Sequence, residues 1–204
     1  MTEQTAATST LVTAFRRLFE NEFATLDGIT ISLRTRQDVR FVDERSALGC
    51  MLFGNEAGTM TEPPRSETHA LHLALYQASP QAESVVSGWS RHLRALLLEG
   101  YEPPEPTSMM RKRGIPDVGA HLVAPDALAG EALARSIEQA QSLASENGMR
   151  HLLLVTTEGM VAVAGAPANE AMAHWHNIEF ASRVACLSIE EASVHQASRD
   201  GSDA

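Results

Sequence analysis

Residues 62–100 read EPPRSETHALHLALYQASPQAESVVSGWSRHLRALLLEG, and they carry the clearest structural signals in the chain. Ser66 is a good helix cap and Glu67 suits a first helical turn, so a helix is predicted to begin there. Ser84–Ser87 is short and apolar enough to form a strand. A second helix is predicted over Ser90–Glu99, which a serine opens and a glycine follows. The alternation of helix and strand is typical of an α/β layered domain.

The remainder of the chain continues this alternation, working outward in both directions. Apolar spacing predicts further helices over residues 11–23, 133–148 and 168–191. Strands are predicted at residues 29–34, 39–42, 47–53, 115–123, 151–155 and 160–164, and loops at residues 54–58 and 101–114. We expect one domain over residues 1–191, followed by a polar tail over residues 192–204 that is disordered.

Composition excludes several classes of function. The chain has 204 residues, a net charge of -10 and a pI of about 5.2, which argues against binding to nucleic acid. It has no apolar run long enough to span a bilayer and no pattern of a secretory signal at its start, so a cytoplasmic protein is expected. Cys50 and Cys186 are isolated, and we interpret them as reduced thiols.

Four segments support a more specific reading when they are taken in order. Pro64–Glu67 reads PRSE, His72–Tyr76 reads HLALY, Val85–Ser90 reads VVSGWS, and Leu153–Gly165 reads LLVTTEGMVAVAG. In order and spacing they resemble PSSE, HLAIY, VVHTHS and LLANHGVVVVG of the class II aldolase/adducin family, which includes L-fuculose-phosphate aldolases and ribulose-phosphate 4-epimerases. The resemblance covers roughly residues 10 to 190. It implies a three-layer α/β fold, with a central, mostly antiparallel sheet flanked by helices, in a cyclic homotetramer.

The metal-binding positions of the family are altered in this chain. The resemblance places Ser87, Trp89 and Glu158 where the family has its three zinc-binding histidines. Zinc sites in proteins use Cys, His, Asp and Glu, so only one suitable ligand remains and no metal cofactor is expected. The alternative is a divalent metal such as zinc at a relocated site, formed by Glu67, Glu158 and His69. Glu67 also matches the family's catalytic acid/base.

A phosphate site is implied by two other matched segments. Thr30 and Ser32 match the polar face of the family's phosphate-binding strand, and Arg65 and Ser66 match the serines of PSSE. Hydroxyls, a helix N-terminus and a guanidinium together suit a small anion. The alternative is that the two strand hydroxyls and the arginine are simply solvated. Trp89 is expected either to fill the space of the metal or to stack on a ligand.

These observations favour a protein that is not an enzyme. The leading hypothesis is a non-catalytic or metal-independent oligomeric binding protein, a tetramer, for a small anionic, sugar-phosphate-like ligand or a protein partner. The alternative is an active aldolase, epimerase or decarboxylase-type lyase on a small phosphorylated sugar, using Glu67 and an altered site. His92, His121 and His151 are interpreted as packed or solvated side chains.

Overall fold

The protein is organised around one mixed sheet. The computed structural model describes residues 13, 28–34, 39–43, 67–105, 108, 111, 117–165 and 168–200. Within these residues six strands pair in the order β2-β1-β3-β6-β5-β4. The strands are β1 (Thr30–Arg34), β2 (Val39–Asp43), β3 (Ser84–Trp89), β4 (Leu122–Val123), β5 (Leu152–Thr156) and β6 (Met160–Gly165). All neighbours are antiparallel except β4 and β5, which confirms the predicted, mostly antiparallel sheet.

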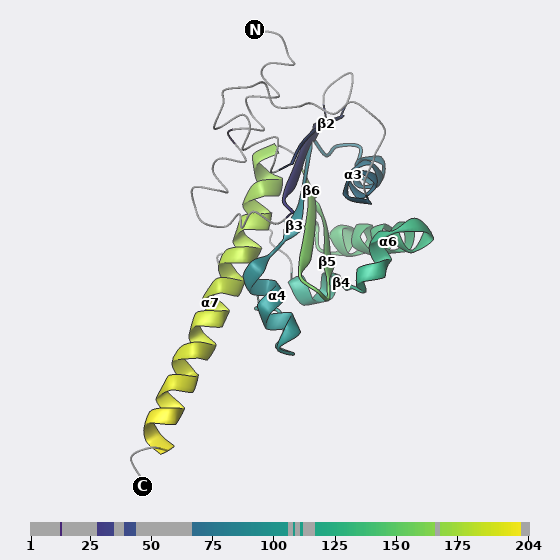
Figure 1. Cartoon of the computed structure of the whole chain (residues 1–204). Coiled ribbons are helices and arrows are strands. Elements are labelled where there is room, and N and C mark those ends of the chain that lie inside the picture. The colour runs from purple at the N-terminus through teal and green to yellow at the C-terminus, as the bar shows by residue number, and fades with distance from the viewer. Residues whose placement is uncertain are drawn as a thin grey trace.

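Helices cover both faces of this sheet, as the three-layer prediction requires (Figure 1). The helices are α3 (Glu67–Ala78), α4 (Arg91–Leu98), α6 (Gly130–Glu146) and α7 (Ala168–Asp200), with short 3-10 helices η1 (Val118–His121) and η2 (Pro125–Leu128). Helix α7 packs on β3, β6 and α4, whereas α3 packs on β3 and α6, and α6 on β5. The part of the chain that the structure describes contains no helix long and apolar enough to cross a membrane.

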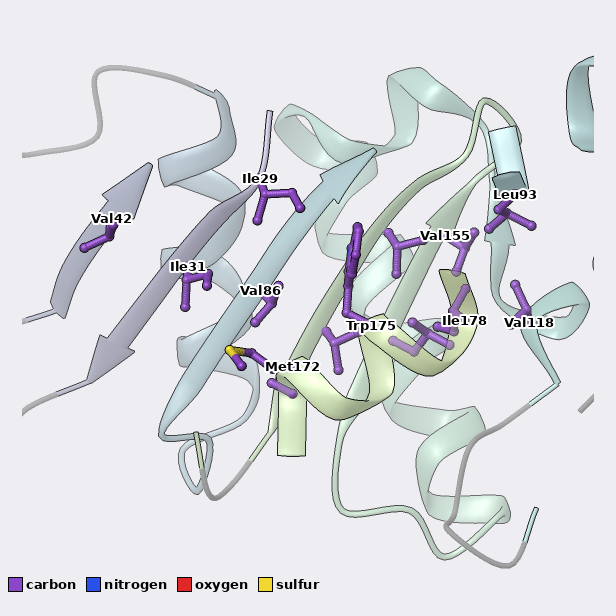
Figure 2. Close-up of a cluster of buried hydrophobic side chains, with 14 of the residues drawn as sticks. Ile29, Ile31, Val42, Val86, Leu93, Val118, Val155, Met172, Trp175 and Ile178 are labelled. Atoms are coloured by element: carbon purple, nitrogen blue, oxygen red, sulfur yellow. The ribbon is translucent and has the colours of Figure 1, made fainter. Parts of the chain in front are cut away.

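The alternation of side chains along the strands divides the interior into two apolar clusters. One cluster lies between the sheet and α7 and includes Ile31, Val86 and the fully buried Trp175 (Figure 2). The other lies beneath α3 and α6 and includes Leu75 and Val85. Successive residues of β3 therefore serve opposite faces, so Ser87 and Trp89 lie on the α3 side of the sheet.

Three local expectations are corrected by the structure. The strand predicted over residues 115–123 is wrong in most of its length, because Asp117 accepts a hydrogen bond from Gly119 N and opens η1, which leaves only Leu122–Val123 as strand. Ser108 and Arg111 are helical, although a loop is predicted there. Helix α7 continues past the predicted end near residue 191 to Asp200, so most of the expected tail is helical.

Several predictions fall outside the described residues. These are the helix over residues 11–23 apart from residue 13, the strand at 47–53, the loop at 54–58, and residues 201–204 at the end of the expected tail. Cys50, Arg65 and Ser66 also lie outside them. Glu67 is described, and α3 begins at this residue as predicted.

Candidate functional site

Ser87, the first of the three positions that are expected to have lost a zinc-binding histidine, lies inside the protein. It sits opposite Thr30 in the pairing of β3 with β1. Ser87 and Ser32 are both 0% exposed, and Thr30 is 7% exposed, so the idea that these strand hydroxyls are solvated is wrong. The three hydroxyl groups lie on the same face of adjacent strands, beneath α3.

A buried histidine joins two of these hydroxyls. His72, on the inner face of α3, has its Nε2 atom 2.7 Å from Ser87 Oγ and its Nδ1 atom 2.7 Å from Ser32 Oγ. Ser32 Oγ donates to Tyr76 OH at 3.1 Å, and Tyr76 OH donates to the Ser32 carbonyl at 2.9 Å. Because each hydroxyl has one proton to donate, His72 donates from Nδ1 to Ser32, and Ser87 donates to Nε2.

The charge state of this network follows from its burial. Burial, followed by the nearby His69, lowers the pKa of His72 from 6.5 to about 3, so the imidazole is neutral at physiological pH. Burial also raises the pKa of Tyr76, which keeps its hydroxyl protonated. The network is therefore uncharged, and all of its donors and acceptors point at one another. The spacing of His69 and His72 predicts a shared helix face, and both are buried.

Trp89, the second altered position, is half-buried at the end of β3. The guanidinium carbon of Arg94, one turn into α4, lies 4.8 Å from the centre of the Trp89 ring. On another side Gly28 approaches closely, since a Cβ atom there would be 3.2 Å from Trp89 Cδ1. The indole is thus held between a cation and a glycine backbone, and the cation–π contact favours this orientation.

Glu158, the third altered position, is exposed in the turn between β5 and β6. The next residue, Gly159, has a φ of +89°, and a Cβ atom there would lie 2.6 Å from Arg94 Cα. Its carbonyl accepts a hydrogen bond from Ser90 N at 2.9 Å. The turn is therefore packed against the start of α4, near the end of β3 that carries Trp89.

A buried carboxylate, which was not among the predicted site residues, anchors the same corner. Glu179 of α7 is 1% exposed. Its Oε2 accepts from Ser90 Oγ at 2.5 Å and from His92 N at 3.3 Å, and its Oε1 lies 2.5 Å from His92 Nδ1. Ser90 Oγ in turn accepts from Leu93 N, as the predicted helix cap. The signal available in the sequence was a glutamate on the otherwise apolar face of α7.

Glu67 differs from these buried groups in its exposure. It is the first residue of α3 and is exposed. Arg34, which was not among the predicted site residues, lies at the other end of α3 and donates to the carbonyls of Tyr76 at 2.5 Å and Pro80 at 2.6 Å. Arg34 therefore fixes the C-terminal end of α3 to β1.

A second group of histidines lies on the α7 side of the sheet. The rings of His151 and His174 stack with their centres 3.9 Å apart, and both are buried. Burial, followed by His174 and His121, lowers the pKa of His151 to about 3. His121 Nδ1 lies 3.1 Å from the Leu153 carbonyl. The two stacked rings are inclined by 28° to each other, and among the described residues no three His, Cys, Asp or Glu side chains form a metal-binding group.

Comparisons with known proteins agree with this architecture. Residues 9–186 match the model of the Class II Aldolase and Adducin N-terminal domain. A search of curated protein sequences found no match.

The fold is similar to several solved structures. YgbL from Escherichia coli is 19% identical, with a TM-score of 0.60 over 88% of this chain and 87% of that chain. An L-fuculose 1-phosphate aldolase is 14% identical, with a TM-score of 0.58 over 93% of this chain and 88% of that chain. The l-fuculose-1-phosphate aldolase from Thermus thermophilus is 16% identical, with a TM-score of 0.53 over 91% of this chain and 97% of that chain.

Proposed function

Because the chain belongs to the class II aldolase and adducin family, we propose that it is a metal-independent, non-catalytic member that binds a small anionic ligand. The ligand class is sugar-phosphate-like, and the protein acts as a cytoplasmic homotetramer. The observation that carries the proposal is the bond between Ser87 Oγ and His72 Nε2, at 2.7 Å in the interior. Ser87, at a position where the family is expected to have a zinc ligand, here donates a hydrogen bond to the neutral imidazole of His72.

The three residues at the zinc positions do not suit zinc. The Ser87 hydroxyl is not a usual zinc ligand and is turned toward His72. The Trp89 indole N–H is only a hydrogen-bond donor, and Arg94 brings a positive charge against its ring. Glu158 alone offers a carboxylate. We therefore assign no step of a reaction to a metal at this place.

An anion is the ligand that the surrounding groups favour. Helix α3 begins at Glu67, and the first N–H groups of a helix attract negative charge. We place the anion against Thr30, Arg65 and Ser66, with Glu67 and Trp89 toward its other end. Ser32 supports the site indirectly, because its hydroxyl is already bonded to His72 and Tyr76. Glu67 disfavours a second negative charge, so a single phosphate or carboxylate with a neutral tail fits best.

The exposure of Glu67 favours one alternative function. A carboxylate that solvent can reach is able to exchange a proton with a substrate, as a general acid or base does. The alternative is therefore an aldolase, epimerase or decarboxylase-type lyase acting on a small phosphorylated sugar. Loss of such an activity in Glu67→Gln, with ligand affinity retained, would favour this alternative over the binding protein.

Metal analysis tests the loss of the zinc site. We expect no stoichiometric zinc in the protein purified without chelator. The triple variant Ser87→His, Trp89→His, Glu158→His should gain about one metal ion per chain, the stoichiometry of a single site. The single variant Glu158→His is the control, because it adds one histidine to the exposed turn alone. About one tightly bound zinc per chain in the unaltered protein would refute the proposal.

Calorimetry tests the anion site. The protein is titrated with a panel of sugar phosphates and small carboxylates. For any ligand that binds, Arg65→Ala should weaken binding by about 1.5–3 kcal/mol, the range for a hydrogen bond to a charged group. Arg135→Ala is the matched control, since Arg135 is an exposed arginine on α6. Equal effects of the two substitutions would refute this placement, and a panel without any binding would refute the ligand class.

A further inference from the structure

Helix α7 is much longer than the surface that it covers. Its 33 residues correspond to about 50 Å of helix. Its buried side chains end at Ser182, and between Arg183 and Ser193 none is buried. Figure 1 shows this C-terminal part of α7 extending beyond the sheet and α4. A helix in water owes most of its stability to packing, so this part needs a further contact.

An apolar stripe runs along the outer side of α7. Phe180, Val184 and Leu187 are 52%, 46% and 51% exposed. They are separated by four and then three residues, which is the spacing of one face of a helix in a coiled coil. Trp175, Ile178 and Ser182 mark the buried face. With 3.6 residues per turn, the stripe falls on the opposite side, where the chain's own sheet cannot reach it.

The charges beside the stripe indicate which partner would bind to it. Arg183 and Glu190 are exposed, seven positions apart, and lie on the same flank of the stripe. In a parallel pair of α7 helices, each of these charges would lie level with its own copy. In an antiparallel pair with Val184 facing the partner's Leu187, Arg183 comes beside the partner's Glu190, and the pairing occurs twice by symmetry. Opposite charges at flanking positions set partner choice and orientation in paired helices.

From the outward stripe and these complementary charges we infer that α7 is a docking surface for α7 of a second copy of the chain, in antiparallel order. A two-fold interface of this kind is self-complementary, since each copy offers the same surface. The patch is small, so it forms a reversible contact with a dissociation constant on the order of micromolar. This surface is separate from the anion site at the start of α3, and either can be wrong without the other.

Sedimentation of the full chain over a range of concentrations tests the apolar part. Leu187→Asp should weaken self-association by about tenfold or more, because a leucine that pairing would bury is replaced by a charge. Leu98→Asp is the matched control: Leu98 is 64% exposed on α4, off the stripe, and its change should leave association unaltered. Circular dichroism checks that both variants fold.

Charge exchange tests the orientation. Arg183→Glu should weaken association, and adding Glu190→Arg should restore it, because the antiparallel pairs are re-formed with reversed signs. No recovery in the double variant would overturn the antiparallel order. A mass that is constant at all concentrations, or equal effects of Leu187→Asp and Leu98→Asp, would overturn the docking surface. A protein of constant mass that loses stability on Leu187→Asp would also overturn it, by showing that the assembly already covers the stripe.

Discussion

Replacing Glu179 with alanine removes the buried group that joins α7 to the corner between β3 and α4. The carboxylate accepts from Ser90 Oγ at 2.5 Å and from His92 N at 3.3 Å, and it also pairs with the His92 ring. Alanine would leave the donors of Ser90 and His92 facing a void. Trp89 immediately precedes Ser90, so the candidate site depends on this anchor.

The size of the effect follows from the geometry. Hydrogen bonds to a charged group contribute about 1.5–3 kcal/mol each, and the bonds to one carboxylate are not independent, so the loss of those from Ser90 and His92 together costs about 3–5 kcal/mol. Glu179 is 1% exposed, so water does not replace it without rearrangement. We expect Glu179→Ala to lower the free energy of unfolding by about 3–5 kcal/mol.

Urea denaturation followed by circular dichroism measures this change, at one protein concentration for all variants. Glu138→Ala is the matched control, because Glu138 is an exposed glutamate of α6, and we expect its effect to stay within about 0.5 kcal/mol. Glu179→Gln, which keeps the shape and part of the hydrogen bonding, should fall between them. If Glu179→Ala cost no more than Glu138→Ala, the reasoning that this carboxylate is the anchor would be refuted.

Two further predictions concern pH and backbone conformation. The pKa values of His72 and His151 are lowered from 6.5 to about 3 in the folded protein. The unfolded chain therefore binds more protons than the folded protein between these two pH values. Folding stability should be constant above about pH 7 and fall as the pH drops below 6.5. Each histidine contributes a slope of about 1.4 kcal/mol per pH unit to the free energy of unfolding. His151→Asn should therefore flatten the pH profile of stability measured by urea denaturation. An unchanged profile would contradict the neutral state of His151. Gly159→Ala should cost about 2–4 kcal/mol, because its positive φ is unfavourable and its Cβ would meet Arg94 Cα at 2.6 Å. Gly148→Ala, which has a positive φ of +63° but open space around it, should cost only about 1 kcal/mol, and equal melting temperatures for the two variants would argue against the contact with α4.

Local patterns predicted most of the fold, and long-range contacts explain what they missed. The cap at Ser90, the strand predicted over Ser84–Ser87 and the order of the elements are properties of neighbouring residues, and the structure has them, with the strand extended to Trp89. The segment before Val123 is apolar enough for a strand, but the side chain of Asp117 turns it into a 3-10 helix first. A single capping bond of this kind competes with strand propensity and is hard to weigh from composition.

The site was harder to predict because its partners are distant in the sequence. The resemblance to the family marked Ser87, Trp89 and Glu158 as altered, but nothing near Ser87 in the sequence indicates that His72 would accept a hydrogen bond from it. Glu179 lies 87 residues from His92, with which it pairs. Only the packing of α7 on α4 brings the two together, so the sequence showed a glutamate on a helix and could not show its role.

Glu179 and Phe180 are consecutive residues of α7 that face in different directions, one toward the candidate site and the other toward solvent. If pairing displaced α7, the two surfaces would be thermodynamically linked. Any displacement of α7 on pairing would change the position of the carboxylate that holds Ser90, next to Trp89. Pairing would then change the affinity for the anion by some factor. By reciprocity, bound anion would change the affinity of one copy for another by the same factor. The concentration of the chain would then regulate ligand binding, through two adjacent residues of one helix.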